Sequence, residues 1–287
     1  MRCIRVENAK DRSCFIMGFP EAGKTTYLAA LSALLQEEGI EKKLRWPRYC
    51  EDSSHLTQLA LTWFEGTNVP RTPIDGEMKK LPLHLEDTDG NQYRIYVPDI
   101  SGESFQNLYD LRRAEPEMVE LFQNCDGILL FIHPGKIIEP HLISEVPDSL
   151  RLGSTETPIE DIPTPSAIPL TELLQFAEEI RASRPVSLGV VVSAWDVLPV
   201  WDKKAEPEAY IRTKIPLLWQ YLSSNPEIFL TSYYGVSAQG GDLSDEKKAN
   251  ELLTQYAEEP IKRMKAIKPD GQDTYDLSLI LWETLMG

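Results

Sequence analysis

Short apolar runs alternate with longer stretches of helical periodicity along most of the chain. Residues 14–17, 127–133 and 188–192 consist almost entirely of apolar residues and glycine. Such runs are typical of strands that are buried on both faces of a parallel sheet. Residues 228–234 predict a further strand of this kind.

Two more strands are predicted at residues 81–85 and 93–97, on either side of the turn-forming sequence DTDGN at residues 87–91. A turn signal of this type between two strand-like runs predicts a hairpin. With it the chain has six predicted strands, which we expect to form one mostly parallel sheet.

Helices are predicted between these strands. Residues 25–36 form one, and residues 171–182 form another with Thr171 as its N-cap. Residues 208–222 form a third, which Pro216 is expected to kink or divide, and residues 245–266 a fourth, interrupted by Pro260. A final helix near the C-terminus is expected to pack on the sheet. This alternation predicts an α/β fold with helices on both faces of the sheet.

The length of 287 residues and the absence of a clear linker favour a single domain over residues 1–287. Two stretches read as insertions, at about residues 45–80 and 134–169. The second is rich in proline and acidic residues, which is typical of a long surface loop.

The formal net charge of −16 argues against general binding to nucleic acid or to an anionic membrane. We find no apolar stretch of the roughly 18–20 residues needed to span a bilayer, and no signal-peptide core. The cysteines show no C-x-x-C pairing, which favours reduced thiols in a cytoplasmic protein: Cys3, Cys14, Cys50 and Cys125.

The most informative motif is GFPEAGKT at residues 18–25, which fits the phosphate-loop pattern G-x-x-x-x-G-K-[ST]. It lies between an apolar run and a predicted helix, as the motif requires. Backbone N–H groups of such a loop cradle phosphate oxygens. We expect Lys24 to reach the β- and γ-phosphates and Thr25 to bind Mg²⁺. The predicted nucleotide-binding residues of this segment are Gly18, Glu21, Ala22, Gly23, Lys24, Thr25 and Thr26.

A second motif, D-x-x-G, begins at Asp99, directly after the strand at residues 93–97. A carboxylate at the end of the strand beside a phosphate loop is the usual Mg²⁺ partner. The N–H of Gly102 is expected to approach a γ-phosphate because glycine has no side chain to intrude.

Two further segments follow the last two predicted strands. Ser193-Ala194-Trp195-Asp196 stands where Ras-like proteins carry N-K-x-D, with only the aspartate retained. A carboxylate at Asp196 would accept hydrogen bonds from guanine N1–H and N2–H₂, which adenine does not offer; the alternative is that Asp196 caps the next helix. Ser237 and Ala238 are similar to the S-A-K loop whose backbone N–H contacts guanine O6.

Taken in this order, the four segments resemble a P-loop GTPase of the translation-factor/Ras-like class. GFPEAGKTTYL, DISGE, SAWD and the ending from Asp276 to Trp282 resemble more narrowly the bacterial double-GTPases and related domains encoded near conflict-system or effector proteins. The resemblance implies a Ras-like sheet, GTP or GDP, Mg²⁺ and a switch that acts through a partner protein.

The resemblance also suggests which residues bind Mg²⁺ in the GTP state and assist hydrolysis. A threonine that binds Mg²⁺ should lie between the first helix and Asp99. The candidates are Thr62, Thr67 and Thr72, of which we prefer Thr72; the alternative is that Thr72 is simply a turn residue. Arg71 would then be placed to act as an arginine finger, or it is simply an exposed arginine. Glu103 stands at the position of the water-orienting glutamine. Because its charge would repel a γ-phosphate, hydrolysis should be slow or depend on a partner.

The sequence therefore predicts a Mg²⁺-dependent guanine-nucleotide switch with slow or partner-stimulated GTP hydrolysis. Its partners are the guanine nucleotide and an effector protein, with no nucleic acid and no membrane span. Two alternatives remain open: a nucleotide-binding interaction module with little or no hydrolysis, and a P-loop ATPase.

Overall fold

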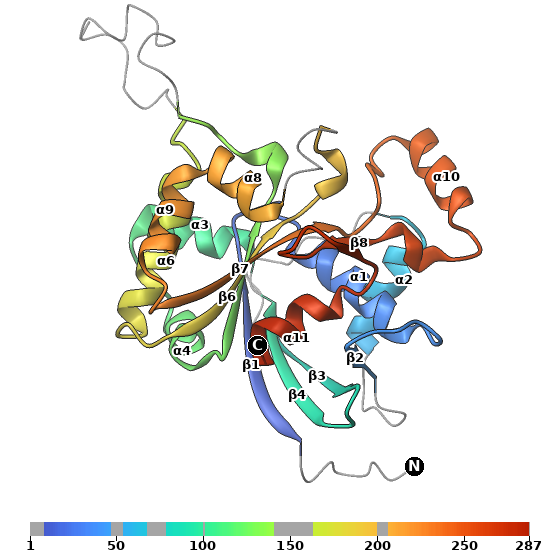
Figure 1. Cartoon of the computed structure of the whole chain (residues 1–287), viewed down its shortest axis with the longest axis horizontal. Coiled ribbons are helices and arrows are strands. Elements are labelled where there is room, and N and C mark those ends of the chain that lie inside the picture. Colours follow the sequence, from blue (N-terminus) through green and yellow to red (C-terminus); the bar gives the residue numbers. More distant parts are fainter. Residues whose placement is uncertain are drawn as a thin grey trace, which may run out of the picture.

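The computed structural model describes residues 9–46, 54–67, 79–99, 101–140, 163–199 and 206–286. These residues form one nine-stranded sheet in the order β2-β3-β4-β1-β5-β6-β7-β8-β9. Figure 1 shows the helices distributed over its two faces. None of the helices in the described ranges is both long and apolar enough to cross a bilayer.

Five parallel strands form the centre of the sheet: β4 (Gln92–Asp99), β1 (Lys10–Met17), β5 (Gly127–Ile132), β6 (Val186–Val192) and β7 (Phe229–Ser237). Every residue of β5 is buried, as its uninterrupted apolar run predicts. Because these strands are parallel, their carboxyl ends lie at one edge of the sheet. The loops that follow them meet there.

Strand β3 (Lys79–Asp87) pairs antiparallel with β4, so the predicted hairpin is confirmed. Its turn is organised by the carboxylate of Asp87, which accepts the N–H groups of Asp89 at 2.9 Å and Asn91 at 2.8 Å and the hydroxyl of Tyr93 at 2.9 Å. These hydrogen bonds to the charged form lower the pKa of Asp87 even though burial, the largest single influence, raises it.

The predicted number of six strands is wrong, because three short strands extend the sheet at its edges. They are β2 (Leu44–Arg45), β8 (Lys265–Ile267) and β9 (Asp273–Thr274), and all three pair antiparallel. Strands this short have no periodicity of their own, so pairing with the neighbouring strand decides their conformation: β2 pairs with β3, β8 with β7, and β9 with β8. The helix predicted to end at residue 266 is correspondingly divided into α10 (Glu246–Gln255), the 3₁₀ turn η5 (Pro260–Arg263) and β8.

One face of the sheet is covered by α1 (Lys24–Gln36), α2 (Ser54–Phe64) and α11 (Ser278–Met286) (Figure 1). Helix α1 has nine consecutive buried residues, because it lies between the sheet and α2. Its Tyr27 hydroxyl donates to the carbonyl of Leu277 at 3.0 Å, which ties the start of α1 to the C-terminal segment.

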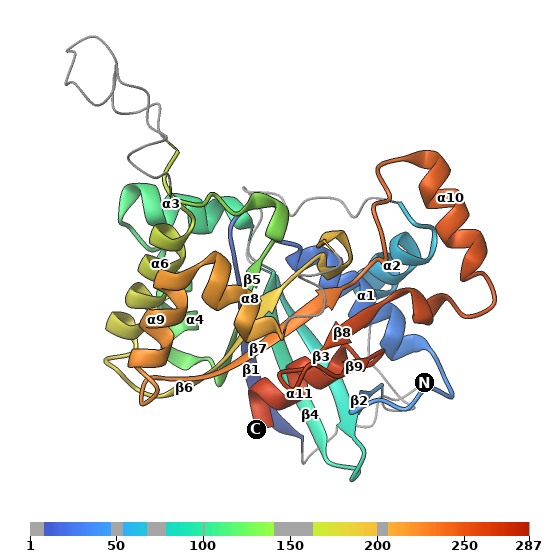
Figure 2. The same ribbon diagram turned by 45° about the horizontal axis from the view of Figure 1, so that its top comes forward.

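The other face is covered by α3 (Gly102–Leu111), α4 (Pro116–Asn124), α6 (Ala167–Ile180), α8 (Pro207–Lys214) and α9 (Pro216–Ser224) (Figure 2). Pro216 divides the predicted third helix into α8 and α9, as expected. Helix α6 begins four residues earlier than predicted, because a first turn tolerates Pro169. Thr171 is therefore no N-cap, and its hydroxyl donates to the carbonyl of Ala167 at 2.7 Å.

The predicted insertion at residues 45–80 contains a helix of the core. Trp63 of α2 is 1% exposed, and its indole N–H donates to the carbonyl of Ala238 at 2.7 Å. The guanidinium of Arg263 lies 4.0 Å from the centre of the Trp63 ring and donates to the Trp63 carbonyl at 2.5 Å. Burial lowers the pKa of Arg263 to about 10. Helix α2 thereby joins the loop after β7 to the interior.

Candidate functional site

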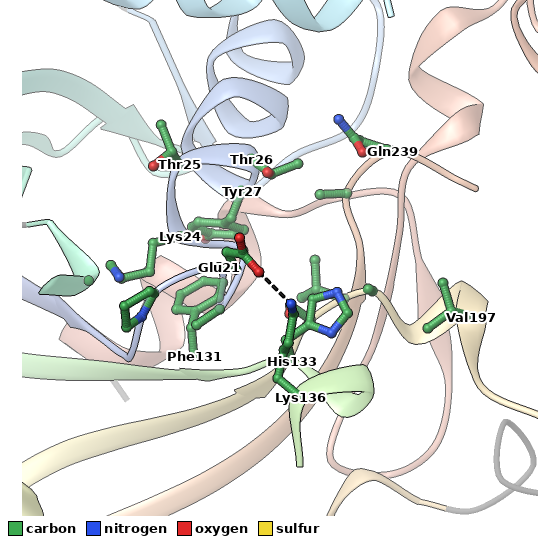
Figure 3. A pocket seen from close by; sticks show the side chains of 18 of the residues that line it. Glu21, Lys24, Thr25, Thr26, Tyr27, Phe131, His133, Lys136, Val197 and Gln239 are labelled. Carbon is green, nitrogen blue, oxygen red and sulfur yellow. Dashed lines mark ion pairs between the residues drawn. The ribbon is translucent and has the colours of Figure 1, made fainter. Parts of the chain in front are cut away.

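A cavity of about 920 Å³ opens at the carboxyl edge of the parallel strands, and Figure 3 shows the side chains that line it. It is formed by the loops that follow β1, β4, β5, β6 and β7. The predicted site residues that line it are Glu21, Ala22, Gly23, Lys24, Thr25, Thr26, Gly102, Glu103, Asp196 and Ala238. The structure thus brings residues from four separate sequence motifs into one space.

The phosphate loop after β1 is packed so tightly that two of its positions require glycine. A Cβ atom at Gly18 would lie 2.7 Å from the carbonyl oxygen of Phe131, and one at Gly23 would lie 2.9 Å from the hydroxyl of Ser193. Gly23 also has a φ of 93° at the start of α1. Gly18 is the first residue of the loop and does not line the cavity itself. The backbone is therefore drawn against the ends of β5 and β6.

The N-terminus of α1 faces this cavity with Lys24, Thr25 and Thr26. No described side chain caps it, and no acidic residue lies in its first turn. Its first N–H groups and the positive end of the helix dipole therefore favour an anion. The glycine-lined backbone and this helix end fit a phosphate group.

Lys24 is held at the mouth of the loop. Its ammonium donates to the carbonyls of Gly18 at 2.7 Å and Phe19 at 3.4 Å, and lies 5.5 Å from the centre of the Phe105 ring. Phe105 belongs to α3, so the lysine touches both the loop and the helix that follows β4. An anion entering the cavity would compete with two backbone carbonyls for this ammonium.

The start of α3 is in direct contact with the phosphate loop. A Cβ atom at Gly102 would lie 2.4 Å from the backbone N and Cα of Pro20. Ser101 caps α3 by accepting the N–H of Ser104 at 3.2 Å, which fixes where the helix begins. Glu103 follows in the first turn and lines the cavity. Only a glycine at position 102 lets the two backbones approach this closely.

The predicted metal ligands are only partly visible. Thr25 lines the cavity, and the backbone of Asp99 ends β4. The side chain of Asp99, and all of Arg71 and Thr72, lie outside the described residues. Thr25 is therefore the one predicted Mg²⁺ ligand whose side chain the described part of the structure places at the site.

Ser193 and Ala194, which also line the cavity, lead from β6 into the 3₁₀ turn η4 (Trp195–Val197). Ala194 adopts a left-handed conformation with φ of 46°. The N–H of Ser193 donates to the carbonyl of Ile132 at 2.9 Å, and Trp195 packs in the core. Asp196 lies within η4, whose N-cap is Ala194, and lines the cavity.

Only some residues of the loop after β7 line the cavity. Ala238 lines the cavity, while its carbonyl accepts the indole N–H of Trp63. Ser237 is 7% exposed and does not line the cavity; its hydroxyl accepts the N–H of Gly240 at 3.2 Å and so shapes the loop. Gln239 and Asp242 also face the cavity, and sequence reasoning missed both.

His133 and Lys136 line the cavity as well, and sequence reasoning missed them too. Lys136 ends the 3₁₀ turn η1 (Pro134–Lys136), which follows β5, and His133 is the N-cap of that turn, where its Nδ1 accepts the N–H of Gly135 at 3.0 Å. Lys136 forms an ion pair with Glu21 of the phosphate loop. The available signal was their place after a buried apolar strand, at the same sheet edge as the motifs.

The pKa of His133 is lowered from its ordinary value by burial and, less strongly, by the neighbouring charge of Lys136. The carboxylates of Asp196 and Glu21 act in the opposite direction but do not reverse it. His133 is thus held as a neutral imidazole at neutral pH.

The model of the Double-GTPase 1 family matches residues 15–283 of this chain. No curated protein matches it. The Arl6 BBS3 small GTPase from Trypanosoma brucei, solved with the bound nucleotide analogue GppNp, aligns with a TM-score of 0.40 at 12% identity, over 88% of this chain and 99% of its own.

Roco2 RocCORdC of Methanosarcina barkeri, solved bound to GDP, aligns with a TM-score of 0.34 at 10% identity; the match spans 90% of this chain and about half of that chain, 53%. Family membership follows from the first match, which covers the phosphate loop and every cavity-lining segment. The chain belongs to the Double-GTPase 1 family.

Proposed function

We propose that this protein is a Mg²⁺-dependent guanine-nucleotide switch that hydrolyses GTP slowly or on stimulation by a partner protein. The observation that carries the proposal is the meeting of the glycine-lined phosphate loop, Gly102 and Asp196 in one cavity of about 920 Å³. A volume of this order suits a nucleotide-sized ligand. Family membership supports guanine-nucleotide binding.

The phosphate end of the cavity would bind the β- and γ-phosphates. The amides at the start of α1 and the ammonium of Lys24 supply the positive groups. The N–H of Gly102 would approach the γ-phosphate from the start of α3. Mg²⁺ would be held by Thr25, with Asp99 and Thr72 as its proposed further ligands, and would neutralise phosphate charge when bound.

The charges around the cavity favour a ligand that brings its own cation. Among the described lining residues, Lys24 and Lys136 are the only lysines or arginines, whereas the carboxylates are Glu21, Glu103, Asp196 and Asp242. A bare nucleoside triphosphate would therefore meet an excess of negative charge. Its Mg²⁺ complex carries less, which supports a Mg²⁺-dependent mode of binding.

The opposite end would select the base. The carboxylate of Asp196 would accept from guanine N1–H and N2–H₂, and the backbone at Ala238 would donate to O6. Adenine offers no donor at its N1 position and has an amino group in place of O6. We therefore favour GTP over ATP.

Glu103 argues for slow turnover. It lies in the first turn of α3 beside Gly102, where its charge would face the γ-phosphate. A partner that supplies a positive group could raise turnover by about 10³–10⁵. The same residue supports a second candidate function, a nucleotide-binding interaction module with little or no hydrolysis.

Calorimetric titration with GTP, GDP and ATP, each with and without Mg²⁺, tests the binding part of this proposal. We expect heat with GTP and GDP, little with ATP, and loss of the guanine-nucleotide signal in Lys24→Ala. Lys262→Ala is a matched control, because Lys262 is exposed, does not line the cavity and pairs with Glu259 at 2.7 Å at the start of η5. A wild-type protein that gives no heat with any purine nucleotide would refute the proposal, and equal affinity for ATP would favour an ATPase.

Phosphate release measures the second part. We expect GTP turnover on the order of 10⁻² s⁻¹ or slower in the protein alone. Turnover that is absent from purified protein and remains absent with its partner would select the interaction module.

A further inference from the structure

The end of the cavity at Asp196 lacks a long side chain from its own segment. Ala194 offers a methyl group, and Ser193 is drawn against Gly23 of the phosphate loop. The adjoining Trp195 is 4% exposed and packs against Tyr210, with ring centroids 5.7 Å apart. A flat base placed beside Asp196 would therefore receive little cover from residues 193–195.

The turn η1 reaches the same end of the cavity from the neighbouring strand. Its backbone is fixed, because the N–H of Lys136 donates to the carbonyl of His133 at 3.0 Å. On its far side the hydroxyl of Ser166 accepts the N–H of Ile138 at 2.9 Å and donates to the carbonyl of Lys136 at 3.4 Å. Because η1 and η4 contact each other, Lys136 extends from a turn that lies next to the turn carrying Asp196.

The other end of the Lys136 side chain is fixed as well. Its ammonium pairs with the carboxylate of Glu21, whose own backbone is in the left-handed region with φ of 62°. Figure 3 shows Lys136 extending from η1 toward Glu21, while Lys24 points into another part of the loop. The methylene stem is therefore held between η1 and the phosphate loop, with 57% of the side chain exposed.

His133 stands next to this stem. Figure 3 shows its ring beside Lys136 on the side toward Val197. Nδ1 accepts from Gly135, so the proton of the neutral ring is on Nε2. Both side chains line the cavity that Asp196 also lines.

We propose that Lys136 and His133 form one wall of the nucleobase pocket, with the methylene stem of Lys136 covering a face of the base while Glu21 holds its ammonium. This wall compensates for the long side chain missing at Ala194. The inference rests on the proposed function. It assigns contacts with the face of the base to Lys136 and His133, whereas Asp196 would form hydrogen bonds with the edge of the base. A lysine stem covers apolar surface well because its charged end can remain solvated or paired.

Titration of GDP and IDP into variants at position 136 tests the proposal. IDP lacks the N2 amino group of GDP, so the two ligands differ in a hydrogen-bond donor at the edge of the base but offer nearly the same face. We expect Lys136→Ala to weaken both ligands by the same factor, about five- to tenfold, as lost apolar cover implies. Lys136→Met keeps the stem without the charge and should remain within about threefold of wild type. Asp196→Asn, in contrast, should weaken GDP more than IDP.

Three results would overturn the proposal. They are unchanged binding of GDP by Lys136→Ala, an equal loss in Lys136→Met and Lys136→Ala, and a loss in Lys136→Ala that differs between GDP and IDP. Thermal melting of each variant checks folding, which an exposed side chain should not disturb. If wild type binds GDP and Lys24→Ala does not, the proposed function stands whatever Lys136 does. If wild type binds no GDP, both proposals fail together.

Discussion

The two ends of the cavity are built in different ways. The phosphate end is formed by contiguous backbone after β1, joined by Gly102 at the start of α3. The proposed base end is assembled from residues on three separate turns, after β5, β6 and β7. The first depends on the absence of Cβ atoms, whereas the second depends on long-range packing. A site built from contiguous backbone can be recognised from the sequence, whereas a site assembled from separate turns can be recognised only once the structure is known.

The largest effect should come from Trp63, which supports the base end from outside the cavity. Trp63→Ala removes a fully buried indole and its hydrogen bond to the Ala238 carbonyl, and should lower the free energy of unfolding by about 3–5 kcal/mol. Denaturant unfolding measures this loss.

Trp63→Phe separates packing from hydrogen bonding at the same position. It keeps a buried ring but leaves the carbonyl of Ala238 without the indole N–H, so it should cost less stability while still weakening GDP binding. A Phe variant with unchanged GDP affinity would show that the base end does not depend on this hydrogen bond.

An intermediate effect is expected at the phosphate end from Gly102→Ala. The added Cβ would meet the backbone of Pro20 at 2.4 Å, so the loop or α3 must move. Overpacking of this kind costs about 1–3 kcal/mol of stability, and a loss of the same size in binding free energy would lower GDP affinity by about five- to 150-fold.

Asn107→Ala is the control for Gly102→Ala, because Asn107 is exposed on the same helix. The GDP affinity measured by calorimetry and the melting temperature of Asn107→Ala should both equal those of wild type. Wild-type GDP affinity in Gly102→Ala would show that the close contact is not needed for binding.

The smallest effect concerns pH and belongs to the base end. The pKa of His133 is lowered in the folded state by burial and by Lys136, with Asp196 and Glu21 opposing the shift. The unfolded chain therefore binds this proton more readily, and the stability contribution is present above the ordinary pKa of about 6.5 and lost as pH falls below it.

Thermal melting between pH 7.5 and 5 should show this decline in wild type. In His133→Asn the decline should be reduced, because an amide oxygen can still accept the N–H of Gly135 without titrating. An identical pH profile in the two proteins would show that His133 does not cause the decline.

The sequence predicts the phosphate end in detail and the base end in part. GFPEAGKT and Gly102 are recognisable because each role needs a particular residue at a fixed spacing. Asp196 and Ala238 could be proposed for the same reason. His133 and Lys136 belong to no motif, since their role depends on how η1 lies beside η4 and the phosphate loop.

The fold shows the same division. The six long strands and the break at Pro216 follow from local patterns. Strands β8 and β9 do not, since three and two residues gain their conformation by pairing at the sheet edge. The buried pairing of Trp63 with Arg263 joins residues that are 200 positions apart, beyond the reach of any local pattern.

The carboxylates around the cavity have a consequence for association kinetics. The whole chain has a formal charge of −16, and Glu21, Glu103, Asp196 and Asp242 concentrate part of it where the proposed ligand enters. A polyanion diffusing toward this opening is repelled at long range, and dissolved salt screens that repulsion. Capture of a nucleotide should therefore become faster as ionic strength rises, opposite to the behaviour of a protein that attracts its ligand with a basic surface.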